Sequence, residues 1–149
     1  MTTALGLAEE ALAATIDAAE AAGIELPEIR YVQMGDPVIA CPSVIATVTA
    51  INTFTDPNVP PGALPGCAPI QVATVSVYVA HEYTCAREDG TDDPEAVYKI
   101  SQVMAAEGNV VWDALNALQF FMGPDNVAVN WTINGGFCYV IGTCTRGIL

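Results

Sequence analysis

The chain has 149 residues, of which 52% are hydrophobic and 14% are charged, and its seventeen acidic and four basic residues give a net charge of −13. This length suits one domain, residues 1–149, with a sizeable buried core, and the hydrophobic content excludes intrinsic disorder. The shortage of Lys and Arg argues against a protein that tracks the phosphates of DNA or RNA.

A helix over residues 4–22 is the first element that the sequence predicts. Its apolar residues recur at helical spacing, at Leu5, Ala8, Leu12, Ile16 and Ala19. Thr2 or Thr3 can cap its start, and Gly23 can end it in a left-handed conformation. The alanine-rich face of this helix favours close packing on a sheet.

Three β segments follow, separated by turn-forming residues. Residues 29–34 form a short strand candidate, residues 38–54 a longer one, and residues 70–84 a long and regular one. We place 70–84 near the middle of the sheet. Residues 55–69 contain five prolines and two glycines, and we expect a long Pro/Gly-rich loop that projects and joins its flanking strands as a hairpin.

The segment 38–54 is apolar on both of its expected faces. The period-two pattern predicts one face with Val44, Ala46, Val48 and Ala50 and another with Ser43, Ile45, Thr47, Thr49 and Ile51. A strand of this kind is covered on both sides or lies against another subunit.

A second helix is predicted from Pro94 to about residue 121. Asp93 precedes the proline as an N-cap, and Glu95 lies beside the positive end of the helix dipole. One apolar stripe runs along the helix, through Val97, Ile100, Met104, Val111, Leu115 and Leu118. Gly108 weakens the middle by roughly 1 kcal/mol relative to alanine, which indicates a close approach to a neighbour or a kink.

The last 25 residues predict a β-hairpin around the turn Asn134-Gly135-Gly136. A two-residue Asn-Gly turn would place Phe137 and Trp131 on opposite faces of the sheet. A three-residue loop pairs Ile133 with Phe137 and Trp131 with Tyr139, so the large apolar side chains share one face. We predict this second register.

The order of elements is helix, strands, helix, hairpin, without an alternating strand–helix series. We therefore predict an α+β fold, in which a mainly antiparallel sheet is packed by two helices and ends in a C-terminal β-hairpin. No apolar run approaches the ~20 residues of a membrane span, and no basic segment typical of a signal peptide opens the chain. We expect synthesis in the cytosol and no membrane partner.

The sequence offers few parts for catalysis. His81 is the only histidine, with Cys85 four residues on and Cys41 able to approach it in space. A small Cys/His hydrolase is conceivable on these residues, but a hydrogen-bonded or surface histidine is the simpler interpretation. The motifs G-x-S-x-G, G-x-G-x-x-G and H-E-x-x-H and the P-loop do not occur.

Metal binding also lacks a suitable ligand set. None of the five cysteines forms a C-x-x-C pair. Cys138 and Cys144 lie six residues apart on one predicted strand, roughly 20 Å along an extended chain, which is too far to share an ion. We expect no catalytic residue, no cofactor and no metal.

A series of short motifs runs through most of the chain in a fixed order. The segment Arg30–Pro37 is followed by Cys41, a β stretch, the Pro/Gly-rich loop, a strand that ends at Cys85, the acidic turn Asp89–Pro94 and a long helix. In this layout the chain resembles the tail terminator proteins of long-tailed, siphovirus-type bacteriophages that infect actinobacteria. It departs from the family pattern after the first glycine, where Pro37-Val38 replaces a Trp-Asp pair.

The resemblance implies a structural virion protein of α+β fold without enzymatic activity, assembled in the host cytoplasm and located at the neck of the particle. It implies a ring of six copies that ends the tail tube, contacts the tube protein and the head connector or stopper protein, and lets DNA pass without specific binding. An acidic lumen would repel the phosphates and let the duplex slide. Low charge and apolar strand faces agree with burial against copies of the same chain.

Two alternatives remain beside this interpretation. One is another neck or tail component, such as a head–tail stopper or a tube subunit, and the other, less favoured, is the small Cys/His enzyme.

Partner contacts are expected in the Pro/Gly-rich loop and at the C-terminus. Residues 147–149 follow the last predicted strand as a short tail that is free to reach a partner. The residues that we assign to subunit or partner contacts are Asp56, Asn58, Val59, Leu64, Ile148 and Leu149.

Overall fold

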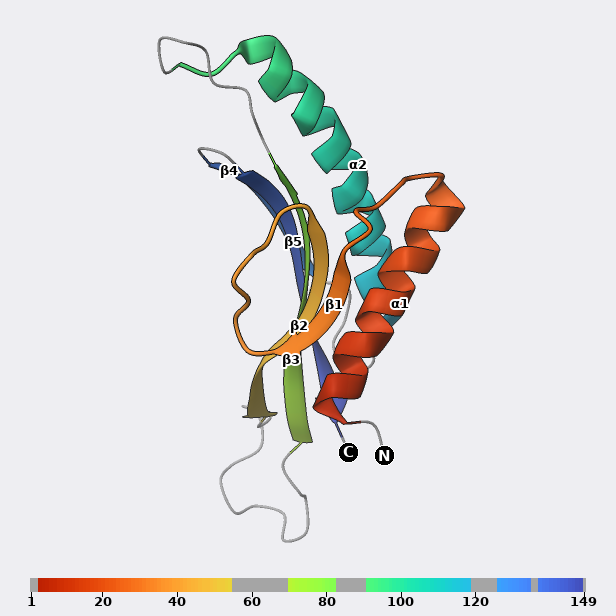
Figure 1. Ribbon diagram of the computed structural model, residues 1–149. Coiled ribbons are helices and arrows are strands. Elements are labelled where there is room, and N and C mark those ends of the chain that lie inside the picture. Colours follow the sequence, from red (N-terminus) through yellow and green to blue (C-terminus); the bar gives the residue numbers. More distant parts are fainter. Residues whose placement is uncertain (1–2, 55–69, 83–90, 119–125, 135–136, 149) are drawn as a thin grey trace, which may run out of the picture.

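The computed structural model describes residues 3–54, 70–82, 91–118, 126–134 and 137–148. These residues form an α+β fold with two helices packed on a five-stranded sheet (Figure 1), as predicted. The elements are α1 (Ala4–Ala22), β1 (Arg30–Met34), β2 (Ser43–Phe54), β3 (Ile70–Glu82), α2 (Pro94–Leu118), β4 (Ala128–Asn134) and β5 (Phe137–Ile148).

The strands lie in the order β1-β2-β3-β5-β4. All neighbours are antiparallel except β1 and β2, which are parallel. β3 is therefore the central strand, as the sequence predicts, and β2 and β3 pair as the arms of a hairpin. The Pro/Gly-rich loop between them lies outside the described residues.

The sheet has two unlike faces. Figure 1 shows α1 and α2 on one face, which we call the helix face, while the segment between β1 and β2 passes over the opposite face, which we call the outer face. The main core lies on the helix face, where sheet valines meet apolar residues of both helices. Its fully buried members include Val44, Val75, Val77, Val79 and Val140 from the sheet and Ala8, Ala11, Val111 and Leu115 from the helices.

Both helices begin, and α1 ends, through local signals that the sequence predicts. The Thr3 side chain accepts a hydrogen bond from the Gly6 backbone N–H at 3.0 Å, and Gly23 ends α1 with a φ of 70°. The Asp93 carboxylate accepts a hydrogen bond from the Glu95 backbone N–H at 3.1 Å, at the start of α2. Capping of this kind is set by a few adjacent residues, which makes helix ends readable from sequence.

β2 begins at Ser43, so the prediction of a strand from residue 38 is wrong. Because β1 and β2 are parallel, residues 35–42 must return along the sheet before β2 can start. A bulge between Val48 and Ala50 then pairs Ala50 with Thr74. Beyond this bulge the alternation reverses, so Ala50 does not share the face of Val48, contrary to the predicted pattern.

The C-terminal hairpin is present, but its predicted register is wrong. Asn134 pairs with Phe137, and Trp131 pairs with Val140 rather than with Tyr139. Trp131 therefore points to the helix face, whereas Phe137 and Tyr139 point to the outer face. Side chains pack on both faces of the sheet here, Trp131 against α2 and Phe137 against Tyr139, so the large apolar groups do not need to share one side.

β5 also extends further than predicted. Gly147 pairs with Val72 and Ile148 with Gln71, so the strand continues through Ile148. Residues 147 and 148 therefore belong to the sheet and are not a free tail.

Candidate functional site

The predicted contact residues are mostly outside the described part of the chain. Asp56, Asn58, Val59, Leu64 and Leu149 fall in segments that the structure does not describe. Ile148 is the last residue of β5. The assignment of Ile148 to a partner contact stays a prediction. Any such contact would be made by the end of β5 and not by a free tail.

A hydrogen-bonded His–Glu pair links the central strand to α2. His81 Nε2 lies 2.7 Å from both carboxylate oxygens of Glu107. The Glu107 side chain has no exposed surface, and the His81 side chain is 20% exposed. A carboxylate withdrawn from water needs a hydrogen-bonded partner of this kind. His81 is thus a hydrogen-bonded histidine, and it fastens α2 to β3.

Glu107 is the residue that sequence reasoning missed. It lies three residues after Met104 and four before Val111, both of which are buried on the stripe of α2 that faces the sheet. A glutamate at such a position points into the core and requires a partner. His81, the only histidine in the chain, is a natural hydrogen-bond partner for this glutamate.

The three described cysteines, Cys41, Cys138 and Cys144, do not have the surroundings of an activated thiol. Burial, and then the charge of Glu82, raise the pKa of the half-buried Cys41, whereas a nucleophilic thiol needs a lowered pKa. Cys85 lies outside the described residues. Cys138 and Cys144 are fully buried on the helix face of β5. The described residues contain no group of three or more His, Cys, Asp or Glu side chains that could hold a metal ion.

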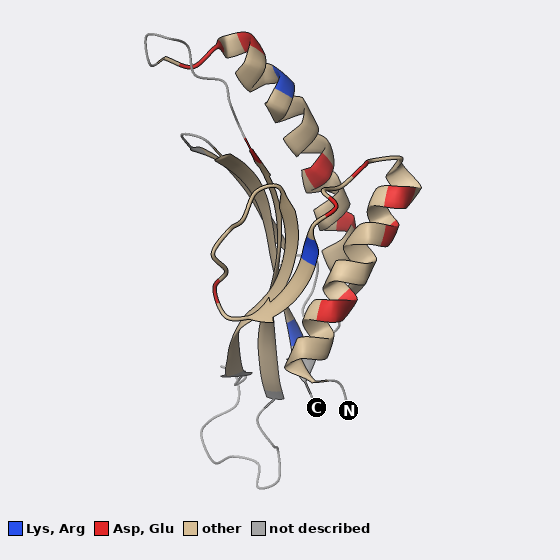
Figure 2. Ribbon diagram, viewed as in Figure 1, with Lys and Arg blue, Asp and Glu red and all other residues tan. Residues whose placement is uncertain are grey.

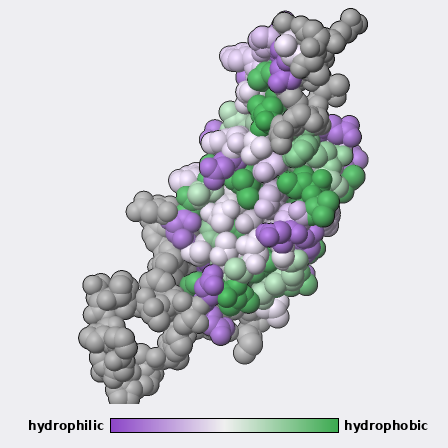
Figure 3. All heavy atoms as spheres, turned by 90° about the vertical axis from the view of Figure 1, so that its left-hand side faces the viewer, coloured by the Kyte–Doolittle hydropathy of each residue, from purple (hydrophilic) through white to green (hydrophobic). Residues whose placement is uncertain are grey.

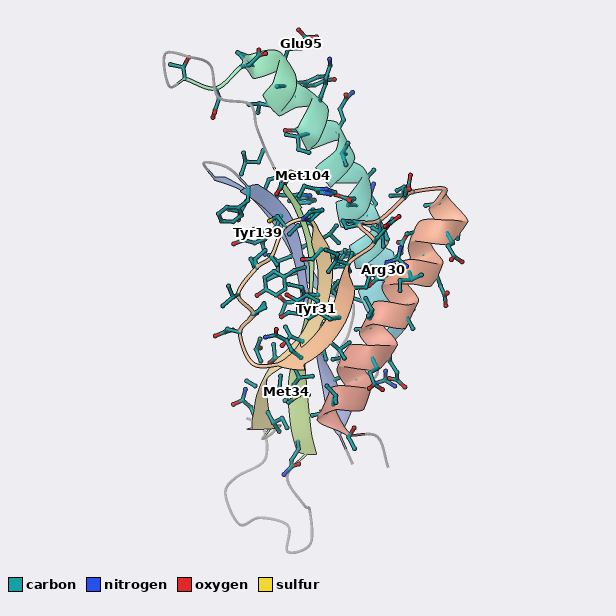
Figure 4. All side chains as sticks on the ribbon, in the orientation of Figure 1. Arg30, Tyr31, Met34, Glu95, Met104 and Tyr139 are labelled. Carbon is teal, nitrogen blue, oxygen red and sulfur yellow. The ribbon has the colours of Figure 1, made fainter. Side chains whose placement is uncertain are left out.

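A small aromatic cluster lies on the outer face of the sheet. The ring centroids of Tyr78 and Tyr139 are 5.9 Å apart, and Phe137 stacks on Tyr139 with centroids 6.0 Å apart. Figure 4 labels Tyr139 on this side of the sheet. Burial, the charge of Asp36 in the β1–β2 segment, and Tyr139 raise the pKa of Tyr78. The β1–β2 segment passes over this same face of the sheet (Figure 1).

The rest of the outer face is mixed in character. Figure 3 views the molecule from this side and shows apolar residues interrupted by weakly and strongly hydrophilic ones. Its half-buried polar residues include Thr74, Thr132, Thr143 and Thr145. Such a surface offers hydroxyl groups and aromatic rings but no concentration of charge.

The free edge of β1 exposes apolar surface. Ile29 is 56% exposed and Met34 is 51% exposed, with Arg30 between them. Arg30 Nε donates a hydrogen bond to the Pro27 carbonyl at 3.0 Å, and Arg30 is the one cation of the described residues that makes no ion pair with a carboxylate. We call Ile29, Arg30 and Met34 the β1 edge.

The free edge of β4, at the other end of the sheet, is also apolar. Trp131 is 52% exposed, Ile133 is 40% exposed, and Trp112 on α2 is 42% exposed. The Trp131 indole lies against Gly108, one helical turn from Trp112, and its Nε1 donates a hydrogen bond to the Met104 carbonyl at 2.9 Å. We call Trp112, Trp131 and Ile133 the β4 edge.

Acidic residues gather elsewhere. Figure 2 shows Asp and Glu mainly on α1, on α2 and in the segments beside them. Two of the described cations are neutralised there, since Arg146 lies 2.7 Å from Glu10 and Lys99 lies 3.4 Å from Glu95. The helix layer is thus the acidic side of the molecule.

The two sheet edges are therefore the best candidates for a functional surface.

Neither helix in the described part of the chain is long and apolar enough to cross a membrane. Comparison with protein-family models and with curated proteins finds no match for this chain.

Proposed function

We propose that the chain is a tail terminator of a long-tailed bacteriophage, a structural protein without enzymatic activity. In this proposal six copies form a ring at the neck of the virion. The ring ends the tail tube, joins it to the head connector or stopper, and lets the genome pass through its lumen.

The observation that carries the proposal is the pair of unlike, apolar edges on one sheet. A subunit with two different contact surfaces associates head to tail, and head-to-tail association closes into a ring when the rotation between subunits allows it. The layout of motifs along the chain supplies the phage context.

The acidic charge supports a DNA channel. Carboxylates that line a lumen repel the phosphates, so the duplex moves without being held. For the lumen to be acidic, the helix layer or carboxylates outside the described residues must face the channel. A mapped lumen that is neutral or basic would count against this part of the proposal.

Interruption of the gene in the phage that encodes the chain tests the function. Without the protein that ends the tube and joins it to the head, we expect filled heads and unattached tails in lysates viewed by electron microscopy. The wild-type gene supplied in trans should restore complete particles. Heads that lose their DNA would indicate a stopper, and heads without any tube would indicate a tube subunit. Normal infectious particles would contradict all three roles.

A further inference from the structure

The two outermost strands of the sheet lack the features that usually protect sheet edges. Edge strands normally carry charged residues or proline, because unpaired backbone groups attract other strands. β1 (Arg30–Met34) and β4 (Ala128–Asn134) contain no proline, and Arg30 is the only charged residue in either strand. In a chain with seventeen acidic residues, two edges without a single carboxylate are suited to pairing.

Met34 of the β1 edge lies on the same face of the sheet as Trp131 and Ile133 of the β4 edge. Met34 pairs with Val48, whose side chain is buried in the helix-face core. Trp131 contacts Gly108 of α2, and Ile133 lies two residues further along the same strand. If the sheet of one copy continued into the sheet of the next, Met34 would meet Trp131 and Ile133 within one layer.

The strand directions also favour such a continuation. β1 runs parallel to β2, and each later pair in the order β2-β3-β5-β4 is antiparallel. β4 therefore runs opposite to β1. Copies that keep their strands in one common orientation bring β1 and β4 together as an antiparallel pair, which is the more stable of the two ladders.

The side chains at the two edges match those found at the centres of protein interfaces. Trp, Met and Arg are enriched there, while Lys, Glu and Asp are depleted. The edges together present two tryptophans, one methionine and Arg30, which makes no ion pair within the described part of the chain. A guanidinium group of this kind can stack on an exposed indole.

We infer that β1 of one copy pairs in antiparallel fashion with β4 of the next copy, which places Arg30 and Met34 against Trp131, Ile133 and Trp112 of its neighbour. This inference rests on the proposed function, because a ring needs two unlike surfaces on each subunit. It names those surfaces and places the subunit contact in the sheet, not in the loops.

A mixing experiment with two edge variants tests the contact. Met34→Lys puts a charge on the β1 edge, and Ile133→Lys puts one on the β4 edge, at positions exposed enough to leave the fold intact. Val103→Lys, at a residue of α2 that is 46% exposed, is the matched control. Because each change lowers the net negative charge, any loss of association cannot come from added self-repulsion.

The masses of these proteins in solution give the result. Light scattering at high protein concentration should show assemblies for the wild type and for Val103→Lys, and mainly the 15.6 kDa monomer for each edge variant alone. An equal mixture of the two edge variants should form particles of twice the monomer mass and nothing larger, because each retains one intact edge. Formation of this heterodimer also proves that both variants are folded.

Three outcomes would overturn the inference. They are a wild type that stays monomeric, edge variants that assemble as the wild type does, and a mixture that stays monomeric. Assembling edge variants together with the phage phenotype expected from gene interruption would reject the contact and leave the function standing. Heterodimers from the mixture together with normal particles after gene interruption would reject the function and leave the contact standing.

Discussion

At the residue scale, the His81–Glu107 pair is the feature that departs most from an ordinary apolar core. Glu107 is buried completely, whereas His81 retains some contact with solvent. The two partners are therefore not equivalent. A Glu107 side chain without its histidine would be left buried and without its hydrogen-bond partner, while His81 without its glutamate could still hydrogen-bond to water.

This asymmetry predicts unequal costs for two single substitutions. We expect His81→Leu to lower the free energy of unfolding by about 3–5 kcal/mol and Glu107→Leu to lower it by less, with the double variant more stable than His81→Leu alone. Urea unfolding of the four proteins at neutral pH measures all three values. A larger loss for Glu107→Leu than for His81→Leu would contradict the account of the pair.

A second prediction concerns the thiol of Cys144, which is 1% exposed. Burial raises the pKa of this thiol to about 11, although Arg146 acts in the opposite direction. The Cys144 thiol releases its proton at lower pH in the unfolded chain than in the folded chain. The contribution of this thiol to the free energy of unfolding is therefore constant below about pH 8.5 and is lost as the pH rises toward 11.

The loss from this one group should be on the order of 2 kcal/mol. Urea unfolding of the wild type and of Cys144→Val between pH 8 and pH 11 isolates it, because both proteins contain the same tyrosines and lysine. The wild type should lose more stability than the variant across this range. Equal slopes would mean that the Cys144 thiol ionises in the folded protein as it does in the unfolded chain.

At the element scale, two glycines determine how closely α2 approaches the sheet. A Cβ atom added at Gly142 of β5 would lie 2.2 Å from Val111 Cγ1, and one added at Gly108 of α2 would lie 2.5 Å from Trp131 Cζ2. The sheet thus has a glycine, Gly142, where α2 projects Val111, and α2 has a glycine, Gly108, where the sheet projects Trp131. Prediction of a close approach at Gly108 is confirmed, and its partner is a tryptophan of the same chain.

Gly108→Ala therefore tests the contact between α2 and β4. Alanine is the better helix former by about 1 kcal/mol, yet its methyl group would push the indole away and break the Trp131–Met104 hydrogen bond. We expect a net loss of about 1–2 kcal/mol and a red shift of the tryptophan fluorescence. In a Trp131→Ala background the same change should be neutral or stabilising, and a loss in both backgrounds would point to a cause other than the indole.

The helix ends could be predicted from the sequence because they depend on neighbouring residues. The hairpin register and the start of β2 could not, because they depend on contacts with distant parts of the chain. Helix caps at Thr3, Gly23 and Asp93 depend on near neighbours and were correct. The predicted hairpin register is wrong because it assumes one buried face, whereas Trp131 contacts α2 on one face and Tyr139 packs with Tyr78 and Phe137 on the other. Val38 was placed in a strand because valine favours β structure, but it lies in the returning segment and is 90% exposed.

At the scale of the whole molecule, strand order is what reveals the candidate functional surface. Low charge and apolar strand faces in the sequence agree with burial against other copies of the chain, but they do not identify β1 and β4 as the edges of the sheet. β1 and β2 are consecutive strands that pair in parallel although no helix connects them, and no local sequence pattern predicts such a pairing. Once the order is known, the shortage of charge on both edges becomes an argument about association.

The most direct test of the account is a cryo-electron microscopy map of the purified virion that contains this chain. We predict six copies in a ring between the tail tube and the head connector, with β1 of each copy beside β4 of the next and a continuous sheet around the ring. A map in which the neck lacks this chain, or in which it is present as an isolated subunit with both edges in solvent, would contradict the account.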